Sequence, residues 1–228
     1  GVNLPIKREL STKELGFKRK QLNSLYVQNS RGKFELELIG SLKQPMLDVR
    51  KFAWDMSIFL AQEFSLLSIA SKYSTGSSIM PNKSNPDVIE IIRANYSVLA
   101  GHYFELENLL SLPSGYHRDL QLTKRSIVHS IHCTMRTLKI IPELVQSIEV
   151  DIKRSHDLID KDMLMTSKVN TLVQAGMPFR EAYLKIKTGK DIGTSASLKN
   201  KQINKFSSGS PFNLQLSLLR RRLKKHID

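Results

Sequence analysis

Apolar side chains recur every three or four residues along three long segments of this 228-residue chain, and this pattern restricts the fold more than any other feature. Stripes with a period near 3.5 residues are typical of long helices packed side by side. No run of alternating apolar and polar residues indicates a strand. We therefore predict an all-α fold, a long-helix bundle with a small C-terminal helical region. The three stripes consist of Ile39, Leu42, Met46, Val49, Ala53, Met56 and Leu60; of Ile92, Tyr96, Leu99, Tyr103, Leu106 and Leu110; and of Ile127, Ile131, Thr134, Leu138, Ile141, Val145 and Ile148.

Two prolines interrupt this helical pattern. Pro45 falls inside the first stripe and Pro142 inside the third. A proline in a helix interior removes one backbone hydrogen bond and costs about 3 kcal/mol. We therefore expect bends or breaks at both positions.

Segments rich in Ser, Gly and Pro separate the stripes and predict loops. After residue 150 the apolar pattern shortens, which indicates smaller helices. The expected parts are loops at residues 71–86 and 112–116, short helices at residues 168–175 and 178–187, a linker at residues 188–213 and a basic amphipathic helix within residues 214–227.

The net charge of +14 raises nucleic acid or another anionic surface as a partner. Residues 1–33 carry +6 and residues 199–228 carry +7, which leaves +1 for the 165 residues between them. A protein that reads a nucleic-acid groove is expected to carry its charge on the folded surface rather than mainly on its flanks. We therefore do not expect nucleic acid as a partner.

Cysteine content and hydropathy narrow the class of protein further. Cys133 is the single cysteine, which excludes an intrachain disulfide and a cysteine-rich metal site. No apolar run approaches the roughly 18 residues of a membrane span, and the first residues lack the apolar region of a signal peptide. We expect a soluble cytoplasmic protein without a metal ion or a membrane contact.

Residues 75–87 are the segment that most strongly indicates a binding or catalytic site. A Gly/Ser stretch runs into a predicted helix start, with Asn85 as the N-cap and Pro86 as the first helical residue. A helix N-terminus beside Lys83 favours an anion. The alternative is a well-capped helix that follows an ordinary surface loop.

The order of residues in this loop favours the chemical interpretation. Gly76-Ser77-Ser78-Ile79-Met80-Pro81-x-Lys83-x-Asn85-Pro86 resembles the signature of the fumarase/aspartase superfamily, whose members release fumarate from succinyl compounds. Three further stretches are similar to the argininosuccinate lyase family within it. They are residues 87–93 (Asp-Val-Ile-Glu-Ile-Ile-Arg), the Tyr-x-x-Asp-x-Gln-x-x-Lys pattern of residues 116–124, and residues 176–183 (Gly-Met-Pro-Phe-Arg-Glu-Ala-Tyr). The resemblance covers about residues 1–188, with residues 5–33 matching more loosely.

The resemblance implies a role for each matching residue. Ser77 takes the position of the serine that removes the Cβ proton of the succinyl group. Lys83 and Asn85 take positions that hold the carboxylate on which negative charge then develops. Tyr116, Gln121 and Lys124 take positions that bind argininosuccinate, the implied small-molecule substrate, which is split into arginine and fumarate in arginine biosynthesis. The resemblance implies no cofactor and no metal.

The family also implies an assembly larger than this chain. Its members are homotetramers about twice as long, and each active site takes residues from three subunits. We therefore expect residues 1–160 to be a central helical-bundle domain of this superfamily that lacks its N-terminal part. Residues 161–190 are expected to be part of a small C-terminal helical domain, and residues 191–228 a basic linker and tail. The chain is then a C-terminal half that pairs with a complementing N-terminal half, a degenerating copy, or a fragment, and alone it is expected not to cleave argininosuccinate.

Departures from the family pattern keep other interpretations open. The family has Gln-Lys-Lys-Asn where this chain has Asn82, Lys83, Ser84 and Asn85, so one side chain is shorter and one charge is lost. The alternatives are another fumarate-releasing lyase, of the adenylosuccinate lyase or fumarase type, and a non-catalytic degenerate or structural homologue. A nucleic-acid binder that uses the arginines and lysines of residues 220–225 is a third.

Overall fold

The computed structural model describes residues 2–160, 162–189, 207–210 and 213–227. The chain divides into two compact units, Gly1–Leu158 and Ile159–Asp228, and each is described by itself. Residues 190–206 and 211–212 of the expected linker and tail lie outside the described residues.

The first unit is helical, with two pairs of very short strands. Its helices are α1 (Arg8–Glu14), α2 (Ser24–Asn29), α3 (Lys33–Phe59), α4 (Asp87–Leu109), α5 (Thr123–Gln146) and α6 (Ile152–Asp157), with 3-10 turns at η1 (Ser71–Tyr73) and η2 (Arg118–Leu122). β1 (Leu67–Ser68) pairs antiparallel with β4 (Glu149–Val150), and β2 (Thr75–Gly76) with β3 (Ser84–Asn85). The predicted all-α fold is confirmed, since these strands are only two residues long.

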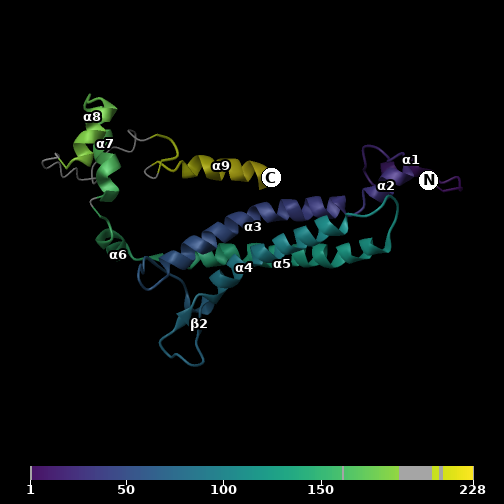
Figure 1. The fold of residues 1–228 in the computed structure, drawn as a ribbon, viewed down its shortest axis with the longest axis horizontal. Coiled ribbons are helices and arrows are strands. Elements are labelled where there is room, and N and C mark those ends of the chain that lie inside the picture. Colours follow the sequence, from purple (N-terminus) through teal and green to yellow (C-terminus); the bar gives the residue numbers. More distant parts are fainter. Residues whose placement is uncertain (1, 161, 190–206, 211–212, 228) are drawn as a thin grey trace. The chain divides into compact units, whose positions relative to one another are not determined.

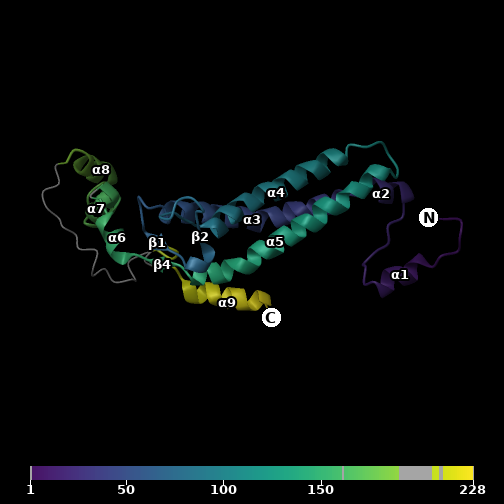
Figure 2. The same cartoon turned by 90° about the horizontal axis from the view of Figure 1, so that it is seen from below.

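Helices α3, α4 and α5 form the bundle, and each contacts the other two. Figures 1 and 2 show them side by side, with β2 at one end of the bundle and α2 and the α4–α5 connection at the other. The buried residues of α3 are Ile39, Met46, Ala53 and Met56, and those of α4 are Ile89, Ile92, Leu99 and Leu106. The first two apolar stripes are therefore the core faces predicted from their spacing.

Of the expected bends or breaks at the two prolines, the breaks are wrong. Helix α3 continues through Pro45, and α5 continues through Pro142. Both prolines lie on exposed positions of their helices, while Met46 and Leu144 beside them are fully buried. Burial of the flanking apolar side chains offsets the backbone hydrogen bond that each proline removes.

The predicted core face of α5 is also wrong in part. Its buried residues include Ser126, Ser130, Thr134 and Thr137, whereas Leu138 is 40% exposed and Val145 is 46% exposed. The helix thus turns a stripe of small hydroxyl side chains toward the bundle. Small side chains permit close approach of neighbouring helices, and Leu138 and Val145 of the apolar stripe stay exposed.

The second unit contains the short helices predicted beyond residue 160. A 3-10 turn, η3 (Asp162–Leu164), precedes α7 (Met165–Gln174), and α8 (Phe179–Lys187) follows. Val169, Ala182 and Ile186 form a small buried core with Leu172 and Met177 packed against it. The expected basic helix is confirmed as α9 (Leu216–Ile227). None of the helices described is both long and apolar enough to cross a membrane.

Candidate active site

The signature loop folds as a hairpin, which we call the serine hairpin (residues 75–85). Thr75 pairs with Asn85, and Gly76 pairs with Ser84. The expectation that Asn85 caps helix α4 is wrong, because its backbone belongs to strand β3 and the capping position is Pro86. The Thr75 hydroxyl donates to the carboxylate of Asp87, the first residue of α4, and this bond ties the base of the hairpin to the helix.

Ser77 lies where the hairpin leaves strand β2. Its Oγ accepts hydrogen bonds from the backbone N–H groups of Ile79, at 3.2 Å, and Met80, at 3.1 Å. The side chain is half-buried. Two N–H donors aimed at one hydroxyl oxygen favour negative charge on that oxygen, which is what a serine needs in order to take up a proton.

Lys83 and Asn85 lie on the returning side of the same hairpin. The backbone N–H of Lys83 donates to the Met80 carbonyl at 3.1 Å, which closes a tight turn at the tip. The Lys83 side chain is exposed and that of Asn85 is half-buried. The two sides of one hairpin therefore carry a serine, a lysine and an asparagine, a set suited to a substrate with carboxylates.

The other predicted binding residues belong to residues 115–124, which we call the tyrosine segment. Gln121, in η2, donates from Nε2 to the Tyr116 hydroxyl at 3.0 Å. Lys124 lies in the first turn of α5 with an exposed side chain. The structure thus brings Tyr116 and Gln121 into contact, and Lys124 lies three residues beyond Gln121.

The serine hairpin and the tyrosine segment lie at opposite ends of α4 (Figures 1 and 2). Helix α4 has 23 residues. At 1.5 Å per residue it is about 34 Å long. A small succinyl substrate does not span that distance, so one copy of the chain does not join its two sets of predicted residues into one site.

Sequence reasoning missed two residues that touch the tyrosine segment, Asn29 and Arg31. The Asn29 side chain accepts a hydrogen bond from the backbone N–H of Gly115, and the Arg31 guanidinium lies over the Tyr116 ring. The available signal was the Asn-Ser-Arg-Gly sequence of residues 29–32, which matches the family only loosely and lies far from residue 115 in the chain.

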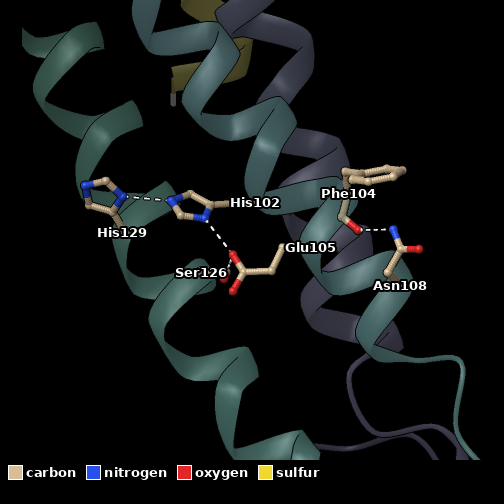
Figure 3. A network of polar contacts seen from close by, with 6 residues as sticks. All are labelled: His102, Phe104, Glu105, Asn108, Ser126 and His129. Atoms are coloured by element: carbon tan, nitrogen blue, oxygen red, sulfur yellow. Dashed lines mark hydrogen bonds and ion pairs between the residues drawn. The ribbon is translucent and has the colours of Figure 1, made fainter.

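A second polar cluster lies in the last two turns of α4 and the first two turns of α5, near the end of the bundle that carries the tyrosine segment (Figure 3). His102 and Glu105 of α4 contact Ser126 and His129 of α5. In the part of the chain that the structure describes, no group of three or more His, Cys, Asp or Glu side chains is placed to hold a metal ion.

Comparisons with known proteins show that this chain is similar to lyases. A family model described as "Lyase" matches residues 1–101, a range that includes the serine hairpin. Argininosuccinate lyase of Stenotrophomonas maltophilia strain R551-3 is 44% identical over 223 residues, which is 97% of this chain and 52% of the relative. Argininosuccinate lyase of Xanthomonas campestris pv. campestris strain ATCC 33913 is 43% identical over the same shares. The chain spans about half the length of the curated relatives it matches.

The extent of these alignments corrects one expectation. An alignment of 223 residues extends past residue 188, so the similarity continues into the basic tail that was expected to be unmatched. The tail is part of the region shared with these relatives.

Solved structures show the same fold at low sequence identity. The 3-carboxy-cis,cis-muconate lactonizing enzyme from Pseudomonas putida has a TM-score of 0.61 at 16% identity, over 79% of this chain and 40% of that one. The class II fumarase from Schistosoma mansoni has a TM-score of 0.57 at 15% identity, over 78% of this chain and 43% of that one. These likenesses show the fold alone, a bundle of long helices.

Proposed function

We propose that this chain, which is similar to argininosuccinate lyases, supplies the C-terminal half of a lyase that converts argininosuccinate to arginine and fumarate. The observation that carries the proposal is the serine hairpin, in which Ser77 Oγ accepts two backbone N–H bonds beside Lys83 and Asn85. The proposed assembly works in the cytoplasm, as a tetramer or with a separate N-terminal half.

The proposed reaction is a β-elimination. Ser77 removes a proton from the Cβ of the succinyl group, and the electron pair moves into the neighbouring carboxylate, which becomes doubly negative. Lys83 and Asn85 stabilise that charge through an ammonium group and an amide N–H. The Cα–N bond then breaks, a carbon–carbon double bond forms to give fumarate, and the departing guanidino nitrogen takes up a proton from a general acid outside this chain.

Tyr116, Gln121 and Lys124 are proposed to bind the substrate in an active site of the same assembly. They lie about the length of α4, roughly 34 Å, from Ser77 of their own chain. The serine hairpin of one copy therefore needs the tyrosine segment of another. This separation supports an oligomer whose active sites form between subunits.

Fumarate production tests the proposal, followed by its ultraviolet absorbance. The chain alone is expected to form no fumarate from argininosuccinate. A mixture with the N-terminal half of the S. maltophilia relative is expected to form it. In that mixture Ser77→Ala should lower the rate by roughly 10²- to 10⁴-fold, whereas the adjacent Ser78→Ala should retain most of it.

The same mixture discriminates the alternatives. Fumarate from adenylosuccinate or malate, but not from argininosuccinate, supports another lyase of the superfamily. A folded mixture that is inactive on all three substrates supports a non-catalytic homologue. Full activity of the Ser77→Ala mixture contradicts the proposed role of Ser77.

A further inference from the structure

The end of α2 and the turn that follows it contact the tyrosine segment, which lies far away in the sequence. Asn29, the last residue of α2, accepts a hydrogen bond on Oδ1 from the backbone N–H of Gly115 at 2.8 Å. Gly115 has a φ of +112°, a conformation that side-chain-bearing residues rarely adopt. The Asn29 amide therefore fixes the backbone at the residue that directly precedes Tyr116.

Arg31, in the same turn, contacts Tyr116 itself. Its guanidinium carbon lies 4.7 Å from the centre of the Tyr116 ring, within the range of a cation–π interaction. Gln121 Nε2 donates to the hydroxyl of that ring. The ring is thus held on its face by Arg31 and at its hydroxyl by Gln121, although 49% of Tyr116 remains exposed.

Close packing at Gly32 determines where this turn lies. Gly32 has a φ of +81°, and a Cβ at this position would lie 2.2 Å from Leu110 Cδ2. The absence of a side chain lets the turn rest directly on the end of α4. A recess of about 280 Å³ forms there, lined by Asn29, Arg31 and residues 112–115 among others, and Tyr116 follows these residues in the chain.

We propose that Asn29 and Arg31 are positioning residues for substrate binding: they hold the tyrosine segment so that Tyr116 and Gln121 meet the substrate in a fixed arrangement. The inference rests on the proposed function for its final step, because Tyr116 and Gln121 are the groups that touch argininosuccinate. Asn29 and Arg31 act through them. Their contacts with the tyrosine segment are present in the structure and do not depend on the proposed function.

Hydrogen–deuterium exchange of the full 228-residue chain tests the contacts without any turnover. Asn29→Leu removes the acceptor and should speed exchange across residues 115–122 by about two- to tenfold. Arg31→Ala should speed it by about two- to fivefold. Asn29→Asp keeps an oxygen acceptor and Arg31→Lys keeps a cation, so both should stay near the native rate.

Gln28→Ala is the matched control, because Gln28 lines the same recess and its side chain makes no hydrogen bond to the tyrosine segment in the described structure. A native circular dichroism spectrum for each variant shows that the bundle is folded. Exchange that is unchanged in both Asn29→Leu and Arg31→Ala overturns the proposal.

Steady-state kinetics of the mixture with the N-terminal half tests the functional step. Asn29→Leu and Arg31→Ala should raise KM for argininosuccinate by about two- to tenfold, with kcat changed less, and the Asp and Lys variants should restore KM. Faster exchange with an unchanged KM shows that the contacts are merely structural and overturns the positioning role. If the mixture with the unmutated chain makes no fumarate, the proposed function is contradicted instead. The exchange rates then test by themselves whether Asn29 and Arg31 hold the tyrosine segment.

Discussion

His102 Nε2 of α4 lies 2.8 Å from His129 Nδ1 of α5, so two helices of the bundle are joined by a hydrogen bond between imidazole rings. The rings meet edge to face at an interplanar angle of 84°. On its other side, His102 Nδ1 lies 3.2 Å from Glu105 Oε2, which also accepts a hydrogen bond of 2.7 Å from the buried Ser126 hydroxyl. Figure 3 shows this continuous path from Ser126 through Glu105 and His102 to His129, and it fixes α4 against α5 by directional bonds.

The first prediction concerns the pH dependence of this cluster. The hydrogen bond from Ser126, and after it the one from His102, holds the pKa of the Glu105 carboxyl below its usual value of 4.5. A carboxyl with a lowered folded-state pKa stabilises the fold fully above its unfolded pKa, and this stabilisation is lost as the pH falls through the folded value. Glu105→Gln should therefore lower the free energy of unfolding at pH 7 and have little effect near pH 3, measured by urea denaturation.

Glu107→Gln on the same helix is the control for a general loss of negative charge. Glu107 is exposed and should give a small change at both pH values. Ser126→Ala should destabilise the fold at pH 7 by about 1 kcal/mol, and less so in a Glu105→Gln background. An equal effect of Glu105→Gln at pH 3 and pH 7 contradicts the pKa argument.

The second prediction contrasts two glycines. Gly32→Ala should destabilise the fold by about 1–3 kcal/mol, because its φ is +81° and its Cβ would collide with Leu110. Gly101→Ala should stabilise it by about 0.5–1 kcal/mol, because Gly101 lies inside α4 with open space around it. Adding Leu110→Ala to Gly32→Ala relieves the collision and leaves the backbone strain, so a full rescue in thermal unfolding would refute the strain.

The third prediction concerns the single cysteine. Burial raises the pKa of the Cys133 thiol, and this outweighs the lowering by Thr137 and Arg136. A raised pKa means a smaller thiolate fraction at pH 8, and the thiolate is the reactive form. Cys133 should react severalfold more slowly with a disulfide reagent in the folded chain than in the chain unfolded by about 8 M urea. Equal rates in the two states would show that the thiol is freely accessible.

The sequence predicts the helices well because their apolar spacing is a local property. Ile39, Met46 and Ala53 are buried where a period near 3.5 residues places them. The stripe of α5 shows the limit of that reasoning. Periodicity identifies an apolar face, but which face meets the neighbouring helices depends on shape, and the hydroxyl stripe of Ser126 and Ser130 packs inward instead.

The sequence likewise identified some residues of the candidate site and missed others. The motif identified Ser77, Lys83 and Asn85 as neighbours, and one hairpin holds all three. Capping rules misplaced Asn85 because they consider only the helix that follows, whereas its backbone pairs with Thr75. Asn29 was missed because its contact with Gly115 joins residues 86 positions apart, which no local pattern encodes.

The last prediction uses two threonines on the buried face of α5. Thr137 Oγ1 accepts a hydrogen bond from Asn95 Nδ2 at 2.9 Å, whereas Thr134 Oγ1 is buried without a hydrogen-bond partner among the residues described. Valine has nearly the shape of threonine with a methyl group in place of the hydroxyl. Thr134→Val removes a hydroxyl that loses its water on folding and forms no hydrogen bond in the described structure, so it should stabilise the fold by about 1–2 kcal/mol. Thr137→Val leaves the Asn95 amide without its acceptor and should destabilise by about 1–3 kcal/mol.

Urea unfolding of the two variants under identical conditions measures this difference in sign, with unchanged slopes of free energy against urea as the check that both remain two-state. Because both substitutions sit on one helix and delete the same group, differences in helix propensity and side-chain volume cancel between them. The remaining difference in unfolding free energy then reports whether the deleted hydroxyl had a hydrogen-bond partner. If Thr134→Val destabilises as much as Thr137→Val, the Thr134 hydroxyl is bonded in solution, and the hydroxyl stripe of α5 contributes to the bundle at Thr134 as it does at Thr137.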